Sequence, residues 1–304
     1  MILTVTLNPA VDQTLQFDGP MEPDTVMRAT DARFDAGGKG INVAPFLTAL
    51  DQPTVASGVV GGFTGAFIRE RLEAEGIPTA FVDAGEPTRL NTSAIADDTE
   101  YKLNHDGPAV EQATVDVVVE RVRERDPDRV LVGGSLPPGV STAAVDAIAT
   151  AGDWDTVVDM DGRHLRSLEA GYALCKPNRS ELSAATGMDV STVGAAARAA
   201  EAFREQGFDA VLASLGGDGA VLATGSALLA APPLDVAVVD TVGAGDALLS
   251  GALAAWADGA DDPTALRTGI AVASRVVARA GTAVPPLGDI EDVRGSVTVR
   301  ELDH

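Results

Sequence analysis

The residues best suited to chemistry lie in a glycine-rich segment that precedes an apolar helix. This segment, Asp240–Ala247, reads DTVGAGDA. Glycines at a helix start let a ligand approach the backbone, and the free N–H groups there attract anions. Such a turn suits the negative charge that develops on a phosphoryl group in transfer. Asp246 could accept a proton from an attacking hydroxyl, although an aspartate in a first helical turn is also a common cap.

A second glycine turn, Gly37–Ala44 (GGKGINVA), also opens a predicted helix. It is not a Walker phosphate loop, because Lys39 is followed by Gly40 and not by the Ser or Thr that binds magnesium. Lys39 still merits attention, since the chain contains only three lysines. Gly58–Gly65 has the wrong spacing for a dinucleotide fingerprint, and no acidic partner follows it at a clear strand end. These features argue against a nicotinamide-dependent oxidoreductase.

Two more segments would suit a nucleotide site. Ser214–Ala220 (SLGGDGA) predicts a strand, a turn and a second strand, with glycines that can adopt positive φ angles. Alone it is a structural hairpin, but beside a nucleotide its backbone would line the phosphates. Lys176–Leu182 (KPNRSEL) follows a strand and begins a helix. Asn178 and Glu181 face the same side of that helix, where they could hold magnesium-bound waters or simply form its start.

Short apolar runs alternate with longer amphipathic stretches, which predicts an α/β domain over 1–304 with a mostly parallel sheet covered by helices on both faces. The predicted strands include Ile2–Leu7, Thr54–Val60, Arg129–Val132, Thr156–Asp159, Ala210–Ser214 and Ala220–Ala223. The predicted helices include Gly65–Glu75, Thr114–Glu124, Thr142–Ala151, Glu181–Thr186, Val193–Gln206, Asp246–Ala257 and Pro263–Ala280.

Residues 11–36 and 88–106 break this rhythm, because their short alternating runs have no helix between paired strands. We expect a small antiparallel flap, or lid, that covers a ligand and excludes water. Arg28, Arg89 and Lys102 fall in or beside these two regions. Their concentration in an acidic chain indicates that the lid binds an anion.

Charge is the most unusual bulk property: 45 Asp and Glu face 22 Lys and Arg, which gives a net charge of −23. Such a chain repels itself, so it suits a medium in which concentrated salt screens the repulsion. We therefore expect a halophilic cytoplasmic protein, with an acidic mesophilic enzyme as the alternative. Duplex nucleic acid is not expected as a partner, because it requires a basic surface.

Other features agree with a cytoplasmic location. No run of about 18 apolar residues is present, so no membrane-spanning helix is expected. Met1–Leu7 predicts a strand and lacks the basic region and cleavage pattern of a signal peptide. Cys175, the single cysteine, cannot form an internal disulfide, which fits a reducing compartment.

Taken together and in order, these segments resemble the ribokinase/PfkB family of sugar kinases over essentially the whole chain. Several motifs are similar to the branch that contains 1-phosphofructokinases and tagatose-6-phosphate kinases. They are Thr6–Asp12 (TLNPAVD), Gly37–Asn42 (GGKGIN), Gly61–Gly65 (GGFTG), Thr88–Asn91 (TRLN) and Gly134–Gly139 (GSLPPG). The resemblance implies a ribokinase-like three-layer α/β sandwich with a mostly parallel central sheet and a small antiparallel lid.

The resemblance also assigns roles on the sugar side of the site. Asp246 would be the general base, and the amides of Gly243, Ala244 and Gly245 would form the anion hole. The branch commonly has Ser where this chain has Ala247, but proton abstraction does not need that hydroxyl and we expect activity to survive. The residues implied for sugar hydroxyls are Asp12, Gly38 and Asn42 with Lys39 close by, and those for the substrate phosphate are Arg28, Arg89, Lys102 and Ser135.

On the nucleotide side, the resemblance implies ATP and Mg²⁺ as cofactors. Asn178 and Glu181 would organise Mg²⁺ through water, together with the phosphates of ATP. The residues implied to line the nucleotide are Ser214, Gly216 and Gly219, with Ala271 to Ser274 bordering the adenine.

The activity implied by the resemblance is phosphoryl transfer from Mg·ATP to fructose 1-phosphate, giving fructose 1,6-bisphosphate. A 6-phosphofructokinase or a tagatose-6-phosphate kinase is the nearest alternative, because one phosphate pocket could receive either end of a ketohexose. A non-catalytic sugar-phosphate sensor is an alternative of another class, which the intact segment Gly243–Asp246 disfavours. The resemblance further implies a homodimer through the lid, since open sheet edges are usually paired or covered.

Overall fold

The computed structural model of the protein describes all residues except 98, 280, 282 and 304. Its strands are β1 (Ile2–Thr6), β2 (Ala10–Phe17), β3 (Asp31–Gly37), β4 (Thr54–Val60), β5 (Thr79–Asp83), β6 (Arg89–Ala96), β7 (Thr99–Leu103), β8 (Arg129–Gly133), β9 (Asp155–Asp159), β10 (Tyr172–Cys175), β11 (Phe208–Ser214), β12 (Ala220–Thr224), β13 (Leu228–Ala231) and β14 (Arg300–Glu301). Its α-helices are α1 (Lys39–Ala49), α2 (Gly62–Ala74), α3 (Gln112–Arg125), α4 (Ala143–Ala149), α5 (Gly162–Leu165), α6 (Arg179–Thr186), α7 (Val193–Arg204), α8 (Ala244–Ala257), α9 (Asp262–Val277) and α10 (Ile290–Arg294).

Most strands form one large sheet in the order β14-β13-β12-β11-β10-β9-β8-β1-β4-β5. The strands from β11 to β5 in this order are parallel, and β12, β13 and β14 extend one edge in antiparallel pairs. All positions of β1 and β4 are buried. Both strands are covered on both faces, so their polar residues Thr4, Thr6, Thr54 and Ser57 are buried together with the apolar ones.

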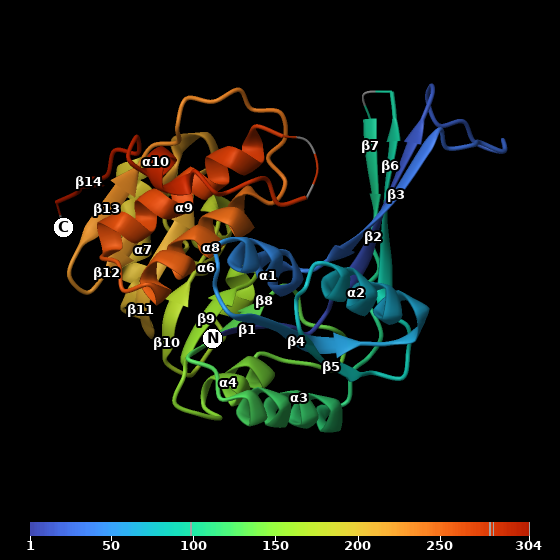
Figure 1. The fold of residues 1–304 in the computed structure, drawn as a ribbon, viewed down its shortest axis with the longest axis horizontal. Helices are drawn as coiled ribbons and strands as arrows, with labels where there is room; N and C mark the ends of the chain where they lie inside the picture. The colour runs from blue at the N-terminus through green and yellow to red at the C-terminus, as the bar shows by residue number, and fades with distance from the viewer. Residues whose placement is uncertain (98, 280, 282, 304) are drawn as a thin grey trace.

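Helices cover both faces of the large sheet. On one face α3 and α7 bury Val118 and Phe203, while on the other α1 and α8 bury Leu47 and Leu249. Figure 1 shows α3 and α4 on one side of the sheet and α1, α8 and α9 on the other. The protein is therefore the predicted three-layer α/β sandwich.

The lid is a separate sheet in the order β3-β2-β6-β7, which projects from the body (Figure 1). The outer pairs β2–β3 and β6–β7 are antiparallel, as expected, but the central pair β2–β6 is parallel. This arrangement follows from the connections, because β2 and β6 each follow the carboxyl end of a parallel strand of the large sheet, β1 and β5. The register of the lid places Asp12 opposite Asn91.

The predicted strands and helices are all present, with some ends displaced by up to three residues. The helix predicted to reach Ala280 ends at Val277, and position 280 lies outside the described residues. β10 is the strand expected before Lys176, whereas β5, β13 and β14 are additional and each has five residues or fewer. Within the described ranges, no helix is both long enough and apolar enough to cross a membrane.

Candidate active site

The candidate site lies where the carboxyl ends of parallel strands meet the starts of two helices. Asp159 ends β9, and Lys176 directly follows β10. Beside them, α1 begins at Lys39 and α8 begins at Ala244, and the two helices pack together. Ligands of open α/β sheets bind beyond the carboxyl ends of the strands, so the glycine turns and the strand ends form one site.

Asp246 lies in the first turn of α8, where protein atoms surround most of its carboxylate. Nδ2 of Asn42, on α1, donates a 3.0 Å hydrogen bond to Oδ2 of Asp246. Burial and then the charge of Asp159 raise the pKa of Asp246 to about 6, against the opposing effects of Lys176, Asn42 and Lys39. A carboxylate with this pKa is well placed to accept a proton near neutral pH.

The turn before Asp246 presents free backbone donors. Gly243 is the N-cap of α8 with φ 78°, a left-handed conformation that favours glycine. Within the described part of the chain, the amides of Gly243 and Gly245 have no hydrogen-bond acceptor, and that of Ala244 makes only a 3.3 Å bond to the Thr241 carbonyl. These amides at the positive end of the helix dipole form a site for an anion.

Beneath this turn lies a buried carboxylate, Asp159, that contacts two ammonium groups. Lys39 Nζ bonds to Asp159 Oδ1, and Lys176 Nζ lies 3.2 Å from Asp159 Oδ2. Lys39 Nζ also lies 3.4 Å from Glu181 Oε1. Burial lowers the pKa of Lys39, but the charges of Asp159 and Glu181 outweigh it and raise the pKa. The site therefore concentrates charges of both signs within a few ångströms of the anion hole.

Asn178 and Glu181 form a capping box at the start of α6. Asn178 Oδ1 accepts a 2.9 Å bond from the Glu181 amide, and Glu181 Oε2 accepts a 2.7 Å bond from the Asn178 amide. The geometry is thus compatible both with a structural role at the start of the helix and with a role in holding magnesium-bound waters. The cap fixes one oxygen of Glu181 and leaves the other, Oε1, facing Lys39.

A cavity of about 860 Å³ adjoins the anion hole and shares Ala244 and Gly245 with it. Its size and its mostly apolar walls with a polar end suit a nucleotide. The predicted nucleotide residues that line it are Asn178, Ser214, Gly216, Gly219 and Ser274.

Ala271 does not line this cavity, contrary to the prediction. It is fully buried in the core between α9 and the sheet, while Ile270, Ala273, Ser274 and Val277 face the cavity. Consecutive residues of a helix point in different directions, so a continuous stretch of α9 could not border the adenine.

The residues predicted to bind the sugar hydroxyls lie at the base of the lid. Asp12 accepts a 2.9 Å hydrogen bond from Asn91 Nδ2. Asp12 packs against Gly37, where an added Cβ would lie 2.0 Å from its carboxylate. The next residue, Gly38, caps α1 with φ 130°, and its carbonyl accepts a 2.8 Å bond from the Asn42 amide. Asn42 therefore connects this polar region to Asp246.

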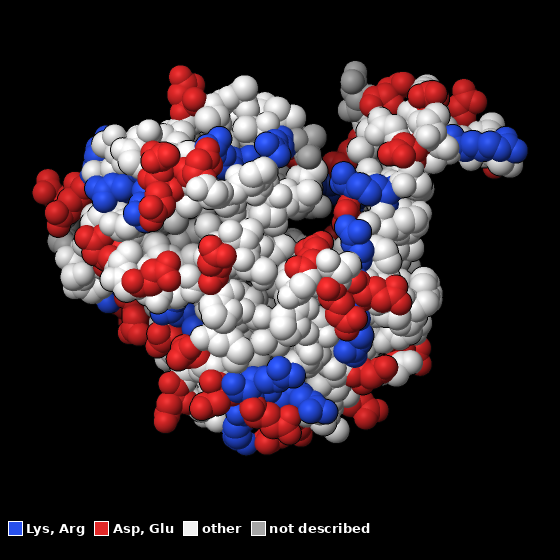
Figure 2. Space-filling model, viewed as in Figure 1, with Lys and Arg blue, Asp and Glu red and all other residues white. Residues whose placement is uncertain are grey.

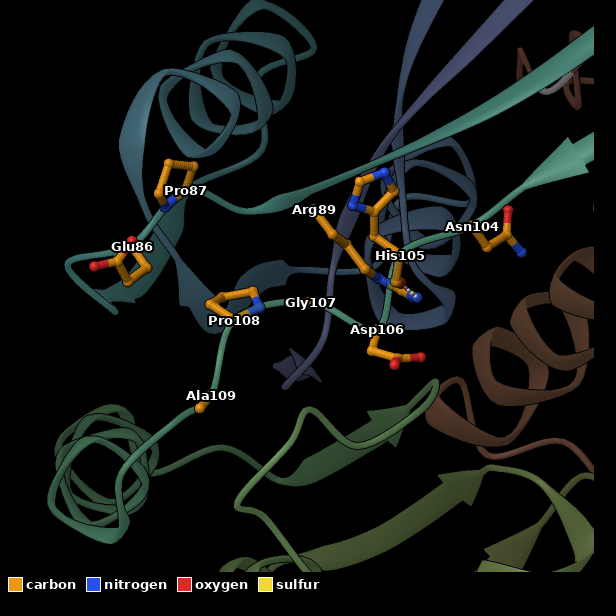
Figure 3. Close-up of a pocket in the computed structure, with 9 residues that line it drawn as sticks. All are labelled: Glu86, Pro87, Arg89, Asn104, His105, Asp106, Gly107, Pro108 and Ala109. Atoms are coloured by element: carbon orange, nitrogen blue, oxygen red, sulfur yellow. Dashed lines mark hydrogen bonds between the residues drawn. The ribbon is translucent and has the colours of Figure 1, made fainter.

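Arg89 and Ser135 form a second polar cluster. Arg89 donates to the carbonyls of Asn8 at 3.0 Å and His105 at 2.9 Å, and its Nη2 lies 3.4 Å from Ser135 Oγ. Asn8 Nδ2 donates to the same hydroxyl at 3.1 Å. Arg89 and residues 104–109 line a cavity of about 610 Å³. Figure 3 shows Arg89 beside His105 in this lining. Arg89 thus holds the loop backbone as well as offering a positive charge.

Both the sequence and the fold match known proteins. The family model for pfkB family carbohydrate kinases matches residues 5–287. The chain belongs to this family. This PfkB family carbohydrate kinase is 57% identical to the 1-phosphofructokinase of Haloferax volcanii over 290 residues, which cover 95% of each chain.

Two further proteins that this kinase resembles carry different names. It is 30% identical over 286 residues to the D-tagatose-1-phosphate kinase of Klebsiella oxytoca, covering 92% of this chain and 94% of that one. The structure of Escherichia coli phosphofructokinase-2 in complex with potassium matches with a TM-score of 0.88 at 28% identity, over 97% of this chain and 98% of that one.

Within one chain of this kinase, Arg28 and Lys102 do not join Arg89. Lys102 lies opposite Ser93, four residues along β6 from Arg89, which is about 13 Å at the rise of a strand. Its side chain is 65% exposed and pairs with Glu100 at 3.3 Å. Arg28 is exposed on the loop beyond the far ends of β2 and β3. Arg28, Arg89 and Lys102 lie near one another in the lid segments of the sequence, but within one chain they do not form a cluster of three cations.

Asp159 and Lys176 are site residues that the sequence reasoning missed. Asp159 ends an apolar strand, a position that gives no contrast in a chain with so many aspartates. Lys176 carried a usable signal, because lysine is so rare in this chain. Two of the three lysines, Lys39 and Lys176, meet at one carboxylate.

Proposed function

We propose that this kinase transfers the γ-phosphoryl group of ATP to fructose 1-phosphate, giving fructose 1,6-bisphosphate. The observation that supports this best is the position of Asp246, which lies between the free amides of the glycine turn and Asn42. A sugar hydroxyl near Asn42 would meet the base and the phosphoryl group together. The name of the Haloferax volcanii relative, a 1-phosphofructokinase, supports the choice of acceptor.

In the proposed mechanism, Asp246 accepts the proton of the attacking hydroxyl during in-line transfer. The amides of Gly243 and Gly245 donate to the oxygens of the transferring group, where negative charge develops. Lys176 adds positive charge directly behind them, because its Nζ would lie only 3.3 Å from a Cβ added at Gly245. Asp12, on the lid, orients the sugar, and closure of the lid excludes water that would hydrolyse ATP.

Mg²⁺ is part of the proposal, and the residues beside the cavity fit it. Among the described residues, no group of three or more His, Cys, Asp or Glu could hold a metal. Mg²⁺ does not need such a group, because it retains waters and uses one or two carboxylates together with substrate phosphates. Glu181 and Asn178 would hold it through water, with Asp159 close by, and the ion would neutralise the charge on the phosphates of ATP.

Product identification by ³¹P NMR tests the proposed function. Fructose 1-phosphate and Mg·ATP would be incubated with the kinase in concentrated KCl, with Asp246→Asn as the control. We expect a second sugar phosphate resonance at C6 and an equal amount of ADP, both absent from the control. Release of ADP without a sugar bisphosphate, or no turnover, would contradict the proposal.

Other acceptors define the alternatives. Fructose 6-phosphate and tagatose 6-phosphate would present the opposite end of a ketohexose to the cluster of Arg89 and Ser135. The Klebsiella oxytoca relative adds D-tagatose 1-phosphate, which shares its phosphate position with fructose 1-phosphate. A non-catalytic sensor would bind these sugars without any turnover.

We also propose that two copies of the chain associate through their lids. The strand register places Phe34, Tyr101 and Leu103 on one face of the lid, and Asp12 on the other. All three apolar side chains are exposed in the single chain, and a second copy would cover them. Light scattering should give twice the chain mass of 31.0 kDa, and Phe34→Glu should give a monomer. A monomeric wild-type protein would contradict this proposal.

A further inference from the structure

The ion pairs around Asp159 are unequal, although both involve a lysine. Asp159 is fully buried and contacts Lys39 through one oxygen and Lys176 through the other. The Lys176 side chain is only 4% exposed and lies under the backbone of Gly245. The Lys39 side chain is 30% exposed. Lys176 is therefore held in place by its surroundings, whereas Lys39 has room to move toward the cleft.

Lys39 also bridges two carboxylates, which Lys176 does not. Its ammonium contacts Asp159 Oδ1 and lies 3.4 Å from Glu181 Oε1. Neither carboxylate is free to follow it, because Asp159 is buried and the capping box holds Glu181 through its other oxygen. The two oxygens therefore define a fixed cation position that the Lys39 ammonium fills.

We propose that Lys39 is an internal placeholder for the metal, occupying the cation position between Asp159 and Glu181 until Mg²⁺ arrives. The inference rests on the proposed function only in taking Mg²⁺ as the metal of this site. Lys39 leaves the two carboxylates when the metal binds, and its ammonium moves into the cleft.

The charges of the site determine how the Lys39 ammonium affects metal binding. Asp159, Glu181 and Asp246 carry three negative charges in their ionised forms, against two positive charges on Lys39 and Lys176. A bare divalent ion must compete with the Lys39 ammonium for both carboxylates, so it binds weakly. Nucleotide phosphates add ligands and offer the displaced ammonium a new partner. Lys39 thus favours metal that arrives together with ATP.

Binding of Mn²⁺ alone, measured by electron paramagnetic resonance without nucleotide or sugar, tests the proposal. Lys39→Gln should bind Mn²⁺ at least tenfold more tightly than the wild-type protein. Lys176→Gln is the charge-matched control, because it removes the other ammonium from the same carboxylate. An affinity of Lys39→Gln no greater than that of Lys176→Gln, or of the wild type, would overturn the proposal, provided that thermal melts show folded proteins.

A second measurement uses the wild-type protein and does not depend on the folding of any variant at the site. Labelling with ¹³Cε-lysine gives three side-chain signals, and the exposed Lys102 is assigned with Lys102→Gln. Saturating Mg²⁺ without nucleotide should shift one of the two remaining signals and leave the other in place. If neither moves, Lys39 is not displaced and the proposal fails. Because no sugar is present, this outcome would leave the proposed acceptor untouched.

Discussion

Asp246 illustrates at the residue scale how a reactive group destabilises the fold that contains it. Burial and the charge of Asp159 raise its pKa from 3.8 to about 6. Between these two values the folded state binds a proton that the unfolded state has already lost, so stability falls as the pH rises through this window. Above about pH 6 the full cost of the buried charge is present.

Replacing Asp246 with Asn should therefore separate catalysis from stability. One pKa unit corresponds to about 1.4 kcal/mol, so we expect the free energy of unfolding at pH 7.5 to rise by about 1–3 kcal/mol. Without its base, kcat should fall by roughly 10²–10⁴. Steady-state kinetics and denaturant unfolding measure the two effects. A variant with near-normal kcat, or with reduced stability, would contradict this account of Asp246.

The pH dependence of the reaction should report the same group. Asp246 accepts a proton only in its ionised form, so kcat/KM should decline about tenfold per pH unit below an apparent pKa of about 6. The profile must be recorded where the protein remains folded, as checked by fluorescence. A kcat/KM that stays constant down to pH 5 would show that the pKa is not raised, or that another group is the base.

At the scale of elements, the start of α8 positions the anion hole through the backbone of Gly243. A residue with a side chain in this left-handed conformation costs about 1–2 kcal/mol. Space is not the obstacle, since the nearest heavy atom to an added Cβ is Val276 Cγ1 at 3.8 Å. Gly259, beyond the other end of the same helix, has φ 79° and no neighbour within 4 Å. The two glycines therefore form a matched pair.

Gly243→Ala and Gly259→Ala should lose similar stability, about 1–2 kcal/mol each. Only Gly243→Ala should also lose at least tenfold in kcat, because relaxation of its strained backbone displaces the amides that bind the phosphoryl group. Thermal unfolding and steady-state kinetics on both variants measure this. Equal kcat values in the two variants would show that the turn is structural.

The sequence could predict the helices and strands that depend on local signals, but not the pairing of distant segments. Apolar runs such as Thr54–Val60 and glycine-led helix starts such as Gly243 are local signals, and the structure contains both. The parallel pairing of β2 with β6 is not local, because it depends on where two distant strands leave the large sheet. Distances within the lid are not local either, which is why Lys102 was expected near Arg89.

For the whole molecule, the net charge of −23 is the dominant feature. Figure 2 shows acidic side chains over the body and the lid alike, with groups of basic side chains among them. Repulsion among these charges opposes the compact state. Dissolved salt screens it, because the distance over which charges interact falls from about 10 Å at 0.1 M to about 3 Å at 1 M.

The melting temperature should consequently rise as KCl increases from 0.1 to 2 M, by about 5 °C or more. The physical reason is screening, so most of the rise should come below about 1 M, where the interaction distance shrinks fastest. Differential scanning calorimetry over a KCl series measures it. A melting temperature that is constant or falls with KCl would contradict the prediction that the protein is halophilic.

The central claim is that the kinase phosphorylates a ketohexose at the end opposite a 1-phosphate. The measurement that tests it most directly is kcat/KM for fructose 1-phosphate, fructose 6-phosphate and tagatose 6-phosphate, side by side with Mg·ATP in concentrated KCl. We predict a preference of at least a hundredfold for fructose 1-phosphate, about 2.7 kcal/mol of transition-state binding. A preference for either 6-phosphate would contradict the claim, while leaving Asp246 and the anion hole in their roles.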